Sequence, residues 1–140
     1  MDNTNIPQPI TTGYKTILPL LQKHNYTRTL FISTPSYKAP QDTFSLIFYL
    51  MISSIQLFFP SAYAEINGMT PLMTALPSEL NWTVFRVPAL GNGDTVPVKA
   101  GFVGEKGLGV KLERKAMVEW VLVEMEKGEW IGKCPQLSNA

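Results

Sequence analysis

The chain has 140 residues, of which 45% are hydrophobic and 16% are charged, with 12 Lys and Arg against 11 Asp and Glu. This length predicts one modest domain, and the composition is too apolar and too weakly charged for a disordered chain. The formal net charge of +1 argues against a protein that binds nucleic acid through a strongly basic surface.

One cysteine, Cys134, and one histidine, His24, exclude a disulfide framework and a multi-cysteine or His-rich metal site. A single cysteine fits a reducing compartment. The first residues have neither a basic nor an apolar signal region, so we expect a cytoplasmic protein. We expect His24 to lie favourably at a helix end and Cys134 to fill a small space in the core.

The first third of the chain predicts a helix that leads into a strand. Residues 1–13 are polar and are expected to form a disordered lead-in to a domain that spans residues 14–140. Apolar residues at helical spacing predict a helix over Tyr14–His24, with Thr12 as its N-cap. The β-branched and aromatic run Thr29–Ser33 predicts a buried strand.

Residues 43–64 contain no charged side chain. Pro60 limits the strongly apolar part to Phe44–Phe59, which is shorter than the roughly 20 residues that a membrane span needs. Three interpretations stay open: a buried or surface-docking helix, a transmembrane helix, and a helix that lies in a membrane interface.

After Pro60, helical spacing predicts a second helix over Ala62–Ala75. The run Trp82–Val87 is rich in β-branched and aromatic residues and predicts an interior strand. Six glycines in residues 91–109 predict a loop with an edge strand over Val96–Val103. The glycine spacing there does not match a Walker phosphate loop.

The last part of the chain predicts a helix and a short strand. An amphipathic helix is expected over Leu112–Lys127, ending at Gly128, and a terminal strand over Trp130–Pro135. The apolar face of that helix is expected to consist of Leu112, Ala116, Trp120 and Val123.

The alternation of helices and strands indicates an α/β fold with a parallel sheet. In such sheets, ligands bind beyond the carboxyl ends of the strands. Two segments of this chain are therefore candidate binding positions: Ser33, Thr34 and Pro35 after the first strand, and Val87, Pro88, Ala89 and Leu90 after the second.

The sequence Asn81–Leu90 (NWTVFRVPAL) resembles the (D/N)WT(V/I)xRxxxL strand of atypical short-chain dehydrogenase/reductases. This group contains the NmrA-like and the flavin/biliverdin reductase-like proteins. Tyr14–Asn25, Arg28–Ser33, Leu112–Lys127 and Gly132–Ser138 resemble that family's fourth helix, fifth strand, late helix and C-terminal strand, in the same order. The chain is most similar to a set of fungal NAD(P)-binding proteins.

The resemblance implies a partial Rossmann-like three-layer sandwich with a parallel sheet. Dinucleotide binding in this fold uses an N-terminal βαβ unit with a glycine-rich turn, and thirteen residues before the first helix are too few for one. We therefore interpret the chain as the truncated C-terminal half of the family fold. The family's Tyr-x-x-x-Lys pair is also absent, since Asn67 stands four residues after Tyr63, and Tyr37 and Lys38 are adjacent.

For the binding residues, the resemblance implies that Ser33 and Thr34, with Pro35, lie near the nicotinamide ribose of NADP or NAD. It implies that Val87, Pro88, Ala89 and Leu90 form the wall beside the nicotinamide ring. The alternative is that these residues have a structural role only. Ser33, Thr34 and Pro35 would then form an ordinary turn, Pro88 would end the strand, and Arg86 would pair with a surface carboxylate.

The expected function is that of an NAD(P)-binding, short-chain dehydrogenase/reductase-like protein. We expect impaired or no hydride transfer to its substrate, a small molecule that the sequence does not identify. One alternative is a non-catalytic interaction module, because half a sheet leaves an exposed edge through which the chain would self-associate. The other is a protein anchored in a membrane through residues 44–59.

Overall fold

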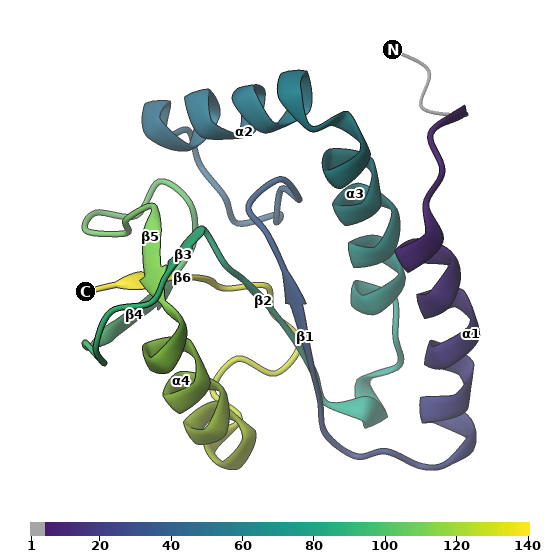
Figure 1. The fold of residues 1–140 in the computed structure, drawn as a ribbon. Helices are drawn as coiled ribbons and strands as arrows, with labels where there is room; N and C mark the ends of the chain where they lie inside the picture. Colours follow the sequence, from purple (N-terminus) through teal and green to yellow (C-terminus); the bar gives the residue numbers. More distant parts are fainter. Residues whose placement is uncertain (1–4) are drawn as a thin grey trace.

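The computed structural model describes residues 5–140, which form an α/β fold around a four-stranded sheet with the strand order β1-β2-β6-β4 (Figure 1). β1 (Thr29–Ser33), β2 (Trp82–Arg86) and β6 (Gln136–Asn139) run parallel to one another. β4 (Val98–Gly101) pairs antiparallel with β6. The sheet is therefore mostly parallel, as the alternation of elements predicts.

β1 and β2 are paired over their whole length, from Thr29 opposite Trp82 to Ser33 opposite Arg86. Because both strands end at the same level, the segments that follow them begin side by side. β1 lies at the edge of the sheet within the described residues, so one side of this strand has no neighbour there.

Helices cover both faces of the sheet (Figure 1). α1 (Pro9–Lys23) and α3 (Pro60–Thr74) lie together over one face, and α4 (Arg114–Lys127) lies over the other. The three layers of the predicted sandwich are therefore present.

Four further elements complete the fold. α2 (Leu46–Phe58) joins the sheet to α3, and a 3-10 turn, η2 (Ser78–Leu80), leads into β2. β3 (Ala89–Gly91) and β5 (Lys111–Glu113) form a separate parallel pair.

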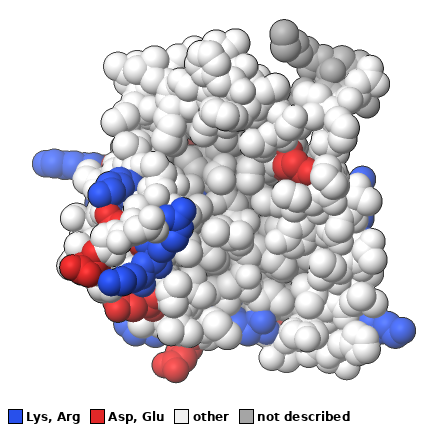
Figure 2. All heavy atoms as spheres, in the orientation of Figure 1, with Lys and Arg blue, Asp and Glu red and all other residues white. Residues whose placement is uncertain are grey.

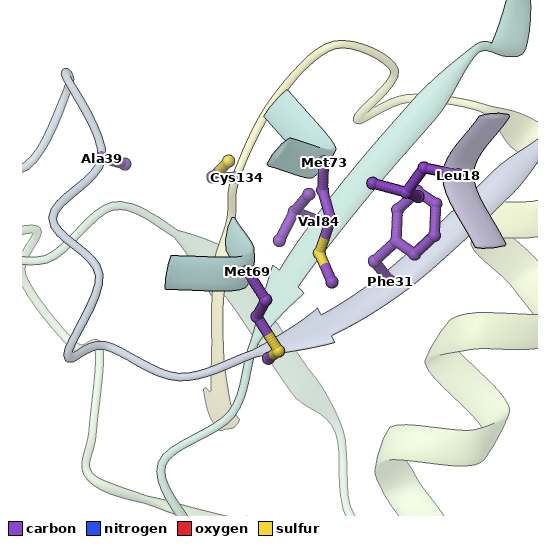
Figure 3. Packing of buried hydrophobic residues seen from close by; sticks show 7 residues of the cluster. All are labelled: Leu18, Phe31, Ala39, Met69, Met73, Val84 and Cys134. Carbon is purple, nitrogen blue, oxygen red and sulfur yellow. The ribbon is translucent and has the colours of Figure 1, made fainter. Parts of the chain in front are cut away.

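Two clusters of buried side chains lie on the two faces of the main sheet. Val84 of β2 belongs to the cluster under α1 and α3, and the next residue, Phe85, belongs to the cluster under α4. This alternation follows from the opposite orientation of successive side chains in a strand. Figure 3 shows Leu18, Phe31 and Met73 close to Val84 in the first cluster.

α2 is the apolar segment predicted from the uncharged sequence, and most of it lies at the surface. Only Phe48 of this helix is buried. Figure 2 shows almost no charged side chains over this part of the molecule. The large apolar residues that are more than half exposed here are Phe44, Leu46, Ile47, Tyr49, Leu50, Leu57, Phe58 and Phe59.

Within residues 5–140, no single helix is both long and apolar enough to cross a membrane. α2 and α3 reach the required length and composition only together, as a pair bent by 111°.

The start of α1 corrects one prediction. The helix begins at Pro9 and not at Tyr14, so residues 9–13 are helical rather than part of a disordered lead-in; residues 1–4 lie outside the described part of the chain. Thr12 lies inside the helix, and the N-cap residue is Gln8, whose side chain makes no cap hydrogen bond. The carboxylate of Glu65 in α3 instead binds the amides of Ile10 and Thr11 in the first turn. A tertiary contact therefore stabilises this helix start.

The C-terminal elements correct further predictions. The terminal strand is Gln136–Asn139 and not Trp130–Pro135, because the chain turns at Gly132, whose φ of +72° suits glycine. The edge strand is shorter than predicted, at Val98–Gly101. Lys111–Glu113 form β5 in place of the first turn of the last helix.

The buried face of α4 also differs from the amphipathic prediction. Ala116 is buried and Trp120 half-buried as expected, but Val123 is exposed, and its neighbour Glu124 is only 3% exposed. The cause is Arg28, whose guanidinium forms an ion pair of 2.9 Å with Glu124.

Candidate functional site

The candidate site begins where β1 and β2 end. The backbone amide of Val87 donates to the carbonyl of Ser33 across 3.0 Å, so the segments after the two strands start in direct contact. This is the edge of a parallel sheet at which ligands bind in α/β proteins.

The turn after β1 is fixed by side-chain hydrogen bonds. The hydroxyls of Ser33 and Thr70 in α3 lie 2.7 Å apart, and Ser33 is almost fully buried. The amide of Ser36 donates to the hydroxyl of Thr34, and the amide of Tyr37 donates to the carbonyl of Thr34. The hydroxyls of Ser33 and Thr34 therefore both have partners within the protein.

A buried ion pair holds the loop that follows this turn. Both terminal nitrogens of Arg86 bind the carboxylate of Asp42, at 2.5 and 2.8 Å. Arg86 also donates to the carbonyls of Tyr37 and Cys134. The partner of Arg86 is thus a buried carboxylate, which corrects the expectation of a surface carboxylate.

Asp42 connects this loop to a third segment of the chain. Its carboxylate accepts hydrogen bonds from the amides of Ala39 and Val103. The amide of Thr43 in turn donates to the carbonyl of Val103. The loop between β1 and α2 is therefore bound to the segment after β4 as well as to β2.

α3 contributes two side chains near the turn. The side-chain amide of Asn67 donates to the carbonyls of Ser36 and Tyr63, at 3.1 and 3.0 Å. Asn67 stands four residues after Tyr63, where a Tyr-x-x-x-Lys pair would need lysine, and here it holds the backbone of the turn. It supplies no cation to the phenol of Tyr63.

Two cavities lie beside the turn. The larger one has a volume of about 640 Å³ and lies between the start of α1, the end of α2 and the first half of α3. The smaller one has a volume of about 300 Å³, lies under the start of α2, and is lined by Tyr63 and Lys38 among others. Ser36 forms part of the wall of both cavities.

Glu65 supplies the charged group in the wall of the larger cavity. Burial raises the pKa of this carboxyl, but the hydrogen bonds from the amides of Ile10 and Thr11 and from the Thr11 hydroxyl stabilise the carboxylate more. The pKa of Glu65 therefore lies below its ordinary value of 4.5. At neutral pH the group is a carboxylate that is already bound to α1.

The structure separates the two predicted groups of binding residues. Thr34 lines the larger cavity and Pro35 the smaller one. Val87 is packed in the cluster under α4, and Pro88 is buried. Ala89 and Leu90 belong to β3, where they pair with Lys111 and Leu112 of β5. Within the described residues, the walls of these two cavities do not include Val87, Pro88, Ala89 or Leu90.

Sequence reasoning missed four residues that organise this region, namely Ser36, Asp42, Glu65 and Asn67. Asp42 had a usable signal, because a lone arginine in a buried strand needs a carboxylate partner. The role of Glu65 had no signal, because its partners in α1 are more than 50 residues away in sequence. Within residues 5–140, no group of three or more His, Cys, Asp and Glu side chains is placed to hold a metal ion.

No protein-family model matches the chain, and no curated protein sequence matches it. Several solved structures share its fold. One is a short-chain dehydrogenase/reductase from Veillonella parvula, solved in complex with NADP, with 12% identity, a TM-score of 0.71 and alignment over 92% of this chain and 58% of that one.

Two further structures agree with this likeness. The oxidoreductase ylbE from Lactococcus lactis has 14% identity, a TM-score of 0.67 and coverage of 91% of this chain and 53% of its own. A putative NAD-dependent epimerase/dehydratase from Bacillus halodurans has 12% identity, a TM-score of 0.68 and coverage of 99% and 61%. The chain thus has a Rossmann-like fold, and it spans 53% to 61% of the length of these three proteins.

Proposed function

We propose that this chain provides the nicotinamide-facing and substrate-facing half of an NAD(P)-binding, short-chain dehydrogenase/reductase-like unit. The observation that carries the proposal is the meeting of the carboxyl ends of β1 and β2, with the amide of Val87 on the carbonyl of Ser33, next to two cavities. Dinucleotides bind at this edge of doubly wound sheets. The structural neighbours, one of them solved with NADP, support the choice of ligand.

The described residues fit one end of such a cofactor better than the other. The proposed nicotinamide side is the turn after β1, where Thr34 lines the larger cavity and Pro35 the smaller one. A pyrophosphate needs a glycine-rich turn at the start of a helix. In the described part of the chain, the helix that precedes β1 begins at Pro9, after the N-cap residue Gln8. The amides of Ile10 and Thr11 in its first turn are bound to Glu65, so this helix start does not fit a pyrophosphate.

When bound, the nicotinamide would supply the hydride chemistry, and the residues of this chain would orient it. Asn67 would keep the turn in place through the carbonyl of Ser36. Because Asn67 replaces the lysine that would lower the pKa of a neighbouring tyrosine, proton transfer by Tyr63 is impaired. We therefore propose a weak or absent hydride-transfer activity for these 140 residues alone. Similarity to the NmrA-like group and a cytoplasmic location stay predictions.

The test is calorimetric titration of the purified chain with the two halves of the cofactor. We expect reduced nicotinamide mononucleotide to bind with a Kd of about 1 mM or lower, and AMP to give no saturable heat. NADPH and NADH should bind no more than about ten-fold tighter than the mononucleotide, because the phosphate half adds little.

Thr34→Val should weaken mononucleotide binding by about three-fold to ten-fold through loss of one hydrogen-bonding group. Thr27→Val, at an exposed position before β1, is the matched control and should leave binding unchanged. Saturable AMP binding would show a phosphate or adenine site in this chain, and no mononucleotide binding would contradict the proposal.

We further propose that a second copy of the chain pairs with the free edge of β1. An unpaired strand edge presents amides and carbonyls to other chains, and two identical edges can form a two-fold symmetric sheet. Sedimentation velocity should detect dimers of the wild-type chain at about 100 µM. Ile32→Pro should give monomers. Alternate residues of a parallel strand direct their amides to opposite sides. Because Ser33 bonds to β2, the amide of Ile32 points to the free edge, and proline removes that amide. A wild-type chain that stays monomeric at this concentration would contradict the pairing.

A further inference from the structure

The sequence contains two Asn-Gly pairs, Asn67–Gly68 and Asn92–Gly93. In such a pair, the backbone nitrogen of the glycine can attack the side-chain carbonyl carbon of the asparagine, because glycine has no Cβ to hinder the approach. The attack closes a five-membered succinimide ring and releases ammonia. The local structure decides whether a given pair reacts, and the two pairs of this chain lie in different environments.

The first pair, Asn67–Gly68, is fixed inside α3, where both residues are half-buried. The side-chain amide of Asn67 donates to the carbonyls of Ser36 and Tyr63. A glycine amide at this place in an α-helix is bound to the carbonyl four residues earlier. Both reacting groups therefore have other partners, and we expect this pair to be protected.

The second pair, Asn92–Gly93, lies in the loop after β3, and both of its residues are exposed. Two side chains from the junction of β5 and α4 bind its reacting groups. The amide of Gly93 donates to Oε2 of Glu113, and the guanidinium of Arg114 donates to Oδ1 of Asn92, each across 2.6 Å. The attacking nitrogen is thus bound to a carboxylate, and the oxygen that would gain negative charge is bound to a cation.

Glu113 is buried and held against this loop. Lys111 binds its other carboxylate oxygen at 2.7 Å. A Cβ atom on residue 93 would lie 2.9 Å from Cδ of Glu113, so this close contact depends on the glycine. The hydrogen bonds from Lys111 and from the amide of Gly93 hold the pKa of Glu113 below its ordinary value of 4.5. At neutral pH the group is therefore a carboxylate that can accept a proton.

We propose that Asn92 is a site of spontaneous modification, converted to aspartate and isoaspartate in a reaction that Glu113 and Arg114 promote. The nitrogen of Gly93 forms a bond to Cγ of Asn92 while Glu113 accepts its proton, and Arg114 stabilises the negative charge on Oδ1. Glu113 then returns the proton to the side-chain nitrogen, the bond from Cγ to that nitrogen breaks, and ammonia leaves. Water opens the succinimide at either of its two carbonyl carbons, so both products form.

The test compares the two Asn-Gly pairs of the wild-type chain during incubation at neutral pH. Trypsin releases residues 87–99, in which Asn92 is the only asparagine, and a glutamate-specific protease releases residues 66–79, in which Asn67 is the only one. Mass spectrometry detects the gain of about 1 Da that accompanies conversion, and enzymatic methylation identifies isoaspartate. We expect conversion at Asn92 to be at least about ten-fold faster than at Asn67, with isoaspartate among the products.

Unfolding the chain in guanidinium chloride removes both environments. The two rates should then agree within about two-fold, and Asn92 should react more slowly than it does in the folded chain, because its reacting groups lose Glu113 and Arg114.

Two variants address the two promoting side chains. Glu113→Gln removes the proton acceptor and should slow conversion at Asn92 by about ten-fold or more. Arg114→Met removes the cation at an exposed position and should slow it by about three-fold to ten-fold. Because Arg114 is exposed, its variant keeps the test valid even where the buried change at Glu113 impairs folding.

The matched control is Lys115→Met, which removes a neighbouring exposed cation that binds Asp94 and not Asn92. Its conversion rate should stay within about two-fold of the wild type, and circular dichroism verifies folding of every variant. Equal rates at Asn92 and Asn67 in the folded chain, or aspartate without isoaspartate, would overturn the proposal. Faster conversion in Arg114→Met would overturn it as well, because the contact would then protect the pair.

Discussion

Both ends of the paired strands β1 and β2 are held by an arginine in an ion pair, and the two arrangements differ in how completely the charge of the arginine is satisfied. At the carboxyl ends, Arg86 is fully buried and binds Asp42 with both terminal nitrogens. At the amino ends, Arg28 binds Glu124 with one nitrogen, keeps 16% of its side chain exposed, and has a buried Nε that finds no partner among residues 5–140.

The environment of Arg28 also differs electrostatically. Burial lowers the pKa of Arg28, and the neighbouring Glu124 opposes that change. The arginine also donates to the carbonyl of Asn81 and the hydroxyl of Thr83, so it connects α4 to the starts of β1 and β2. The comparison indicates that the tighter ion pair lies beside the candidate site and the looser one lies at the far end of the sheet.

The largest expected effect is that of Arg86→Met. This variant leaves Asp42 buried without its cation, which should lower the free energy of unfolding by about 3–5 kcal/mol. Urea denaturation measures the loss. The double variant Arg86→Met/Asp42→Leu should recover the part of the loss that comes from the uncompensated charge, but not the part that comes from the amides of Ala39 and Val103, which lose their acceptor.

The matched control is Lys15→Met, an exposed cation on α1, which should change the free energy of unfolding by less than about 0.5 kcal/mol. Cys134 gives an independent readout, because its carbonyl accepts from Arg86 and burial raises the pKa of its thiol to about 11. Thiol labelling should be about ten-fold faster or more in Arg86→Met. A variant as stable and as slowly labelled as the wild type would show that the ion pair does not hold this end.

A smaller effect is expected from Glu124→Gln at the opposite end of the sheet. The amide keeps the shape of the carboxylate but weakens its bonds to Arg28 and to the amide of Trp130, so the loss should be about 1.5–3 kcal/mol. Hydrogen exchange should increase in α4 and not in the loop that holds Asp42.

Glu126→Gln, an exposed change on the same helix, is the control and should leave both stability and exchange unchanged. A larger loss for Glu124→Gln than for Arg86→Met would reverse the comparison of the two ends.

The smallest effect concerns Glu65, which binds the start of α1. Glu65→Gln should lower the free energy of unfolding by about 1 kcal/mol at pH 7, as for the loss of a helix cap. The folded-state pKa lies below 4.5, so the contribution of Glu65 is present above pH 4.5 and is lost as the pH falls through the lower folded value.

Urea denaturation between pH 7 and pH 3 should therefore show a constant gap between wild type and Glu65→Gln above about pH 5, and a narrowing gap below it. Glu79→Gln at an exposed position should show no such gap. A gap that widens toward low pH would contradict the direction of the pKa shift.

The local sequence pattern was sufficient to predict the helices and strands whose formation depends on their own residues. Thr29–Ser33 form β1 as predicted, and the predicted strand Trp82–Val87 differs from β2 by one residue. The predicted helix Ala62–Ala75 corresponds to α3 with a shift of two residues at its start. β-branched and aromatic runs and helical spacing are local properties, so they can be read without knowledge of the partners.

The predictions that were wrong concern elements stabilised by distant residues. α1 begins early because Glu65 binds its first amides. The C-terminal strand lies four or more residues later than expected because its register depends on pairing with β2 and β4. The same holds for Glu124, which is buried because Arg28 meets it across 96 residues of sequence.

The sequence by itself thus determined the α/β class, the order of helices and strands, and the two segments after β1 and β2 where a ligand was to be sought. Only the tertiary structure decided that, within the described part of the chain, the Ser33 hydroxyl has a partner and the Ser36 hydroxyl has none, and that Val87 to Leu90 do not line the two cavities. The physical reason is that strand and helix formation depend on neighbours along the chain. Whether a buried polar atom is satisfied depends on groups that the fold brings together.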